Sequence, residues 1–269
     1  MYGTNAIFNQ PLAIDRSYLL SLVPHVLQNY QAGFISQEDI DLMAEENINA
    51  QISANSKSGA TKYPVIVDVF GAIVKYSNYN YLGTQSLIRI VNSLDQNPNI
   101  SGILFNIDSG GGMVSGTDEF TATIQGLTKP TIAFTNGYCC SAAMNIASGA
   151  DMRIASPFAD LIGSIGVMLS YQDFSKMFEK WGADLVELYA PQSSEKNIEH
   201  REMSKGNKAL YEESLKEHAS AFIGNMKTNL PNIKDDGHVF KGKTYRPKQA
   251  VEVGLFDELG TLEYALSKF

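Results

Sequence analysis

The sequence predicts an α/β protein in which helices cover a mainly parallel sheet, with a helical extension at the N-terminus. From Tyr63 onward, short apolar runs with strand character alternate with segments whose apolar residues recur at helical spacing. Such alternation is typical of parallel strands joined by helices. Apolar residues make up 44% of the 269 residues and charged residues 19%, the balance of a folded soluble protein.

The expected elements follow one another in the second part of the chain. Strands are expected at 65–69, 72–76, 102–107, 131–135, 153–155, 165–170 and 184–189. Helices are expected at 87–94, 120–127, 141–148, 173–181 and 211–226, and a strand–helix–strand–helix unit over 238–269. The helix at 87–94 is the clearest, because its apolar residues fall at i, i+3, i+4 and i+7.

Residues 1–62 differ from the rest of the chain. Helical patterns cover 17–30 and 37–50, and the small, polar stretch 53–60 is typical of a linker. We therefore expect an N-terminal extension and linker at 1–62, used for assembly, and a main domain at 63–269.

Composition narrows the class of protein. The formal charge is −8 and no run is rich in lysine and arginine, which argues against nucleic acid as a partner. The adjacent Cys139 and Cys140 favour a reducing compartment, because neighbouring cysteines rarely form a disulfide. Residues 1–10 lack the basic region and apolar core of a signal peptide, and no run reaches the length of about 20 apolar residues that spans a membrane. We expect a cytoplasmic protein with no membrane anchor, and no cofactor or metal.

A cluster of glycines follows the apolar run 103–107. Gly110, Gly111 and Gly112 let the backbone approach a ligand and point its N–H groups at a phosphate or a developing oxyanion. The spacing fits neither a P-loop nor a dinucleotide fingerprint. A tight turn without any ligand is an equally good interpretation of this motif alone.

Ser141 is the candidate nucleophile. It follows the apolar strand 131–135 and begins a run of small residues that is expected to start a helix. The amide of Ala142 would lie beside its oxygen as an oxyanion donor. The commoner role for a serine at a helix start is an N-cap, and this alternative stays open.

A nucleophilic serine needs a base, and the candidates are histidine and lysine. His218 lies on an apolar helical stripe and is interpreted as a packing residue, and the other histidines are His25, His200 and His238. Lys196 follows the expected strand at 184–189. Neutralising a lysine at pH 7 costs about 4.6 kcal/mol against its ordinary pKa, so Lys196 alone is more simply interpreted as a solvated loop residue.

Four segments taken together resemble the signal peptide peptidase A family of Ser–Lys serine peptidases. They are 106–114, 140–151, 163–167 and the tail 242–260, and the resemblance covers about 63–269. It implies a Clp-protease-like (crotonase-type) fold. The chain is most similar to the branch of phage capsid-assembly (prohead) proteases, whose members also carry a cysteine directly before the serine. Gly110 stands where many members have proline.

The resemblance assigns roles to particular residues. It implies Ser141 as nucleophile, Lys196 as base, and Ser164 as the residue that orients the lysine amine. The backbone of Gly111 or Gly112 would bind the oxyanion together with that of Ala142. It also implies a protein or peptide substrate such as a capsid or scaffold protein, and a homo-oligomeric ring in which a neighbouring subunit supplies the lysine. The host cytoplasm or an assembling virion is the corresponding location.

Three alternatives remain at this point. A crotonase-type acyl-CoA enzyme would share the fold and the oxyanion site but would not need Ser141. A non-catalytic assembly protein would keep the fold alone. Cys140 is the third alternative, as a nucleophile in place of Ser141.

Overall fold

A parallel sheet forms the centre of the molecule in the computed structural model, which describes residues 12–14, 37–57, 59, 61–78, 80–171, 173–182 and 186–269. The sheet has seven strands, in the order β2-β3-β5-β6-β9, with β7 pairing β5 and β8 pairing β7. Their bounds are β2 (Tyr63–Phe70), β3 (Ile100–Ser109), β5 (Thr131–Cys140), β6 (Met152–Ala155), β7 (Ile162–Gly163), β8 (Thr244–Tyr245) and β9 (Glu258–Leu259). All neighbours from β2 to β9 are parallel, which confirms the predicted α/β class.

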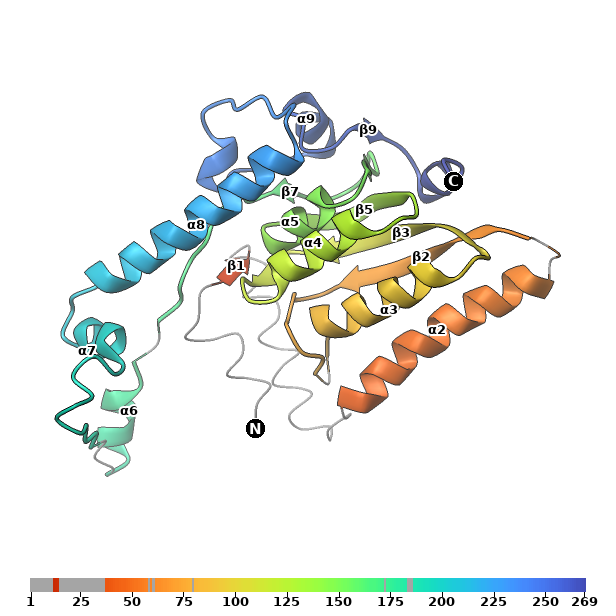
Figure 1. The fold of residues 1–269 in the computed structure, drawn as a ribbon. Helices are drawn as coiled ribbons and strands as arrows, with labels where there is room; N and C mark the ends of the chain where they lie inside the picture. Colours follow the sequence, from red (N-terminus) through yellow and green to blue (C-terminus); the bar gives the residue numbers. More distant parts are fainter. Residues whose placement is uncertain are drawn as a thin grey trace.

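Helices surround this sheet, and a second, smaller sheet lies beside it (Figure 1). The helices are α2 (Gln37–Lys57), α3 (Thr84–Gln96), α4 (Thr117–Gly126), α5 (Ala142–Ser148), α6 (Ser175–Lys180), α7 (Ile198–Ser204), α8 (Ala209–Asn229), α9 (Pro247–Glu252) and α10 (Leu262–Leu266), with a 3-10 turn at Val239–Lys241. The smaller sheet pairs β1 (Leu12–Ile14) with β4 (Gly111–Met113). In Figure 1, α8 runs from the body of the molecule outward to α6 and α7, which form a projecting arm.

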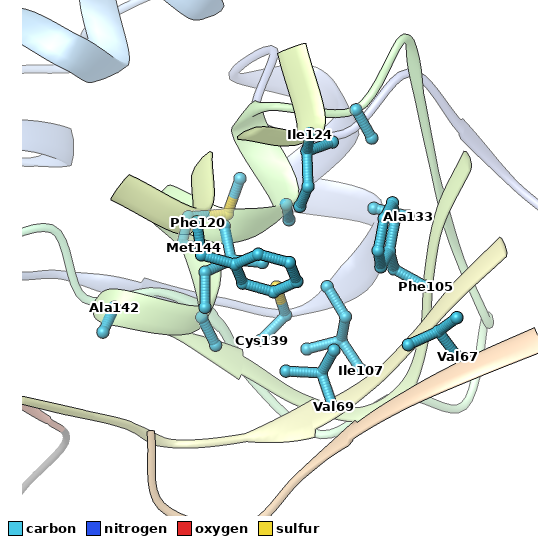
Figure 2. Packing of buried hydrophobic residues seen from close by; sticks show 14 of the residues in the cluster. Val67, Val69, Phe105, Ile107, Phe120, Ile124, Ala133, Cys139, Ala142 and Met144 are labelled. Atoms are coloured by element: carbon cyan, nitrogen blue, oxygen red, sulfur yellow. The ribbon is translucent and has the colours of Figure 1, made fainter. Parts of the chain in front are cut away.

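The strands bury both faces, as parallel strands covered by helices do. On one face, β2, β3 and β5 pack against α3, α4 and α5, where Phe105 meets Phe120 edge-to-face with ring centroids 6.0 Å apart. Figure 2 shows the Phe120 ring beside Met144 and Cys139, and Phe105 beside Ala133. On the other face, Phe134 and its neighbours pack against α10.

Helix α2 covers the exposed edge of the sheet. The Gln51 side chain donates to the carbonyl of Ile66 and accepts from its N–H, both at 3.0 Å. These bonds satisfy backbone groups of the edge strand β2 that would otherwise be free to pair with another chain. The helix continues to Lys57, so the first half of the stretch predicted as a linker is helical.

Three expected strands differ from those in the structure. The chain bends at Gly71 (φ 78°), so 72–76 contributes only a single bridge at Ile73. The strand expected at 165–170 lies earlier, at Ile162–Gly163, where it pairs with the end of β5. Residues 186–189 form no strand, and Leu188 is 91% exposed. The helix predicted at 17–30 falls outside the described residues, within which no helix is long and apolar enough to cross a membrane.

Candidate active site

The final residues of β5 carry Ser141 away from the main sheet. The first half of β5 lies between β3 and β6, whereas Cys139 and Cys140 pair with β7. Strand β3 meets Cys139 through Ser109 after a register shift. Ser141 therefore stands at the end of its strand, next to the segment that follows β3, where parallel sheets commonly place their ligands.

The backbone of Ser141 is strained. Its φ of 57° and ψ of −117° lie in a region that residues with a Cβ rarely adopt. Its N–H donates to the carbonyl of Gly163 at 2.7 Å, and its own carbonyl accepts from Asn145 at 3.0 Å. These bonds hold a sharp strand-to-helix turn, an arrangement that presents the nucleophilic serine in enzymes of the α/β-hydrolase fold.

The side chain of Ser141 does not cap a helix. It occupies the N-cap position of α5 without a capping hydrogen bond, and its hydroxyl donates to the carbonyl of Gly166 at 3.3 Å. The N-cap interpretation left open by the sequence therefore lacks the bond that defines it. Ser141 is only 1% exposed in this conformation.

The segment 163–166 wraps around Ser141 and brings Ser164 into the same region. Ser164 also has a positive φ, 54°, and its N–H donates to the carbonyl of Lys243 at 2.9 Å. Among the described residues, Ser141, Ser164 and Asn197 are the three non-glycine residues with positive φ. Asparagine tolerates this region, so the two serines are the more informative.

Within the glycine cluster, the amide of Gly112 points away from Ile73. Gly111 uses its carbonyl to accept from the N–H of Ile73 at 3.0 Å, and its own N–H donates to Ser109 Oγ at 3.1 Å. Met113 donates its N–H to the carbonyl of Ile73 at 2.8 Å. Because backbone groups alternate along a strand, the N–H and C=O of Gly112 point to the opposite edge of β4.

The backbone of Ile73 lies so close to Gly112 that no side chain fits at this position. A Cβ at this position would overlap the backbone nitrogen and carbonyl of Ile73. Neither of those atoms can rotate away as a side chain could. The glycine is therefore required for β4 to lie against Ile73 with its amide oriented as described.

A small pocket opens beside Ala142. Ala142 is the first residue of α5, so its N–H has no acceptor within that helix. The pocket holds about 30 Å³, and its lining comprises Val114, Thr117, Asp118, Ala142, Asn145, Val167, His218, Ala221 and Phe222. His218 is thus part of the wall of this site, which its place on an apolar helical stripe did not indicate.

Lys196 lies apart from Ser141 within this chain. It is an exposed residue between α6 and α7, in a turn where its N–H donates to the carbonyl of Ser193 at 3.1 Å. Figure 1 shows that this arm is at the far end of α8 from α5. The structure therefore gathers Ser141, Ser164, Gly112 and Ala142, and it leaves Lys196 outside this group.

The two cysteines are buried thiols. Burial raises the pKa of Cys139 well above its ordinary value, with smaller contributions from Cys140 and Asp108. The Cys140 thiol donates to the carbonyl of Leu161 at 3.3 Å. The thiolate is the form in which a cysteine attacks, so the raised pKa of Cys139 disfavours that residue as a nucleophile.

Charged residues brace the segment behind Ser164. Asp236 accepts hydrogen bonds from Lys243 Nζ and from the Tyr245 hydroxyl, each at 2.8 Å. These bonds, that from Lys243 first, lower the pKa of Asp236 to about 2. Since the carbonyl of Lys243 holds Ser164, the Asp236 carboxylate helps to fix the shape of the site.

Sequence comparison identifies the family. Residues 125–269 match peptidase family S49, which is more than half of the chain. The chain belongs to peptidase family S49. This confirms the resemblance to signal peptide peptidase A proteins.

Relatives of this chain include two phage proteins. The capsid assembly protease C of Escherichia phage lambda is 26% identical over 94% of this chain and 61% of its own length. The head-tail preconnector protein GP5 of Enterobacteria phage P21 is 26% identical over 69% of this chain and 40% of its own length. The chain spans about 60% of the length of the first curated relatives it matches.

Solved structures show the same fold. A serine-to-alanine variant of the 1510-N membrane-bound stomatin-specific protease superposes with a TM-score of 0.52 at 16% identity, over 78% of this chain and 85% of that chain. A lysine-to-alanine variant of that protease, in complex with a substrate peptide, has a TM-score of 0.50 at 14% identity, over 78% and 80% of the two chains. The sheet and its helices are thus those of the Clp-protease-like architecture expected from the sequence.

Proposed function

We propose that this chain is a serine endopeptidase in which Ser141 attacks the peptide bond. The observation that carries the proposal is the conformation of Ser141, a strained and uncapped serine at the end of a strand. The amides of Gly112 and Ala142 flank it as oxyanion donors. Family S49 membership favours this reaction over acyl-CoA chemistry on the same fold. A non-catalytic protein would have no use for a serine held under strain.

The reaction is acyl transfer. Neutral Lys196 accepts the proton of the Ser141 hydroxyl as Oγ bonds to the peptide carbonyl carbon, and the carbonyl oxygen becomes an oxyanion held by Gly112 and Ala142. The lysine then gives its proton to the leaving amine as the peptide bond breaks. Water attacks the acyl-enzyme in the same way and releases Ser141. Ser164 orients the lysine amine throughout.

The base is supplied by a neighbouring subunit in this proposal. Lys196 lies between α6 and α7 on the projecting arm, away from Ser141 of its own chain. Trp181 on this arm is 71% exposed and Leu188 is 91% exposed, so the arm carries apolar surface that an interface would bury. A homo-oligomeric ring brings the arm of one subunit over the Ser141 of the next.

The substrate class is a protein chain, and a capsid or scaffold protein is the expected substrate. Two relatives bear phage assembly names, one of them a capsid assembly protease. The pocket beside Ala142 holds about 30 Å³, which favours a short side chain next to the scissile bond. The reaction needs no cofactor.

A serine-reactive fluorophosphonate probe tests the nucleophile. The wild-type chain should be labelled at Ser141 and should hydrolyse fluorescein-labelled casein, whereas Ser141→Ala should do neither while keeping its circular dichroism spectrum. Cys140→Ala is the matched control and should be labelled. Casein hydrolysis by Ser141→Ala would overturn the assignment.

Mixing two inactive variants tests the shared site. Neither Ser141→Ala nor Lys196→Ala should hydrolyse casein alone. Co-refolded in equal amounts, they should regain roughly a quarter to a half of the wild-type rate, because some sites combine an intact serine with an intact lysine from the next subunit. An active Lys196→Ala protein would move the base elsewhere, and a mixture that stays inactive would place both residues in one subunit.

A further inference from the structure

The N-terminal strand β1 lies on the edge of β4 that faces away from Ile73. The two strands pair antiparallel, with Leu12 opposite Met113, Ala13 opposite Gly112 and Ile14 opposite Gly111. Figure 1 places β1 (red) beside the segment that leads into α4, close to α5. A segment almost a hundred residues earlier in the chain thus covers the glycine cluster.

The pairing uses the backbone groups that the catalytic proposal assigns to a substrate. On the Ile73 side, Gly111 contributes its carbonyl and Met113 its N–H. The N–H and C=O of Gly112 therefore face β1, and the register sets Ala13 directly opposite them. In an antiparallel pair of this kind the two residues exchange both hydrogen bonds, so the carbonyl of Ala13 is the group aligned with the Gly112 amide.

An extended peptide that pairs with an exposed edge is a common mode of peptide recognition. A substrate whose carbonyl occupies the oxyanion site must reach the Gly112 amide from the same side as β1. With β1 in place, Ser141 is 1% exposed and both Gly111 and Gly112 are buried. A peptide cannot reach these groups unless the strand that covers β4 moves aside.

We propose that Leu12–Ile14 occupies the peptide-binding edge of the active site as an intramolecular pseudosubstrate and competes with protein substrates. The Ala13–Ile14 bond is the one that this register places at the oxyanion donors. The pairing of β1 with β4 is independent of the proposed peptidase function, whereas the competition with protein substrates rests on it. Release of β1 frees the edge for another chain.

The expected change in KM depends on the fraction of time that β1 occupies the site. A site that is free only a third of the time binds its substrate about threefold more weakly than an open one. A tethered segment reaches effective concentrations on the order of millimolar, so even a weak contact fills the site. Release should therefore lower KM about threefold or more and leave kcat unchanged.

Two proline substitutions in the full chain separate pairing from other effects. Ala13→Pro removes the N–H that faces β4 and puts the proline ring in its place, which breaks the pairing. Ile14→Pro is the matched control, because by strand alternation its N–H points away from β4. Both variants keep the length of the chain, and each adds one proline.

Amide hydrogen exchange measures the pairing of β1 with β4, whether or not the protein is proteolytically active. The Gly112 amide should be protected in the wild-type chain and in Ile14→Pro, and should exchange at least about tenfold faster in Ala13→Pro. Equal exchange in all three proteins would overturn the proposal. Fluorophosphonate labelling of Ser141 in the same samples reports on the nucleophile, so loss of the peptidase function and loss of the pseudosubstrate are distinguishable.

Casein hydrolysis then measures the competition between β1 and a protein substrate. KM for fluorescein-labelled casein should fall about threefold in Ala13→Pro relative to wild type and Ile14→Pro, and a synthetic peptide of residues 10–16 should restore the higher value. Intact mass is measured alongside, and loss of residues 1–13 that is absent in Ser141→Ala would equally place Ala13–Ile14 in the site. Equal KM values for three uncut chains would overturn the proposed competition.

Discussion

The hydroxyl of Ser141 donates a hydrogen bond to the carbonyl of Gly166 at 3.3 Å. In this arrangement the Ser141 proton is directed at a backbone acceptor that cannot remove it. Catalysis requires the hydroxyl to turn from Gly166 to a base. The relationship therefore describes a resting site, in keeping with the distance in Figure 1 between α5 and the arm that carries Lys196.

The strain at Ser141 predicts a difference between two inactive variants. Ser141→Ala and Ser141→Gly should both lose proteolysis, since each lacks the hydroxyl. The glycine variant should be the more stable by about 1 kcal/mol, because φ 57° strains any residue with a Cβ by about 1–3 kcal/mol while glycine loses about 0.5–1 kcal/mol of chain entropy. Urea denaturation measures the difference. A more stable alanine variant would mean that the turn is not strained.

The close approach of Gly112 to Ile73 predicts that Gly112→Ala loses activity. The added Cβ must displace the backbone of β4 or of Ile73, which moves the Gly112 amide away from the oxyanion position. A loss of about 100- to 1,000-fold in kcat is expected for one lost donor.

Gly126→Ala is the control for that substitution. Nothing lies within 4 Å of a Cβ built at Gly126, which is the last residue of α4. It should keep full activity and gain about 0.5–1 kcal/mol in stability. Casein hydrolysis and urea denaturation measure both variants, and an active Gly112→Ala would assign the donor to another amide.

Substitutions of lysine and histidine residues identify the catalytic base. Lys196→Ala should abolish activity, whereas His218→Ala should retain it although His218 lines the pocket. Lys205→Ala and Lys208→Ala are the matched lysine controls on the same arm, and both should stay active. An active Lys196→Ala together with an inactive His218→Ala would indicate a histidine base. Casein hydrolysis measures all four variants.

The stability that the Asp236 carboxylate contributes beside Ser164 should be lost in acid. Its pKa is lowered from 3.8 to about 2, so its contribution to stability is fully present above pH 4 and is lost as pH falls through about 2. Wild type should melt at a higher temperature than Asp236→Asn at pH 5, and the two should converge near pH 2. Asp160→Asn, at an exposed carboxylate for which the described residues show no hydrogen bond, should match wild type throughout. A constant gap between wild type and Asp236→Asn down to pH 2 would contradict the prediction.

Local patterns in the sequence were enough to predict most of the sheet. The apolar runs of β2, β3 and β6 and the helical stripes of α3 and α8 are determined by burial, which leaves a period in the sequence. Segments without such burial were predicted less well. A strand was expected at 184–189, yet Val186 and Leu188 are exposed to solvent on the arm, and the described part of the chain places no strand beside residues 186–189.

The sequence by itself determined the α/β class, the place of Ser141 at a strand end, and the set of glycines and small residues around it. Only the tertiary structure decided that Ser141 is strained and uncapped, that Gly112 faces the edge of β4 away from Ile73, and that β1 lies on that edge. It also separated Lys196 from the serine and placed His218 in the pocket. The physical reason is that periodicity records which face of an element is buried, whereas backbone strain, strand register and contacts between distant segments depend on how the elements pack together.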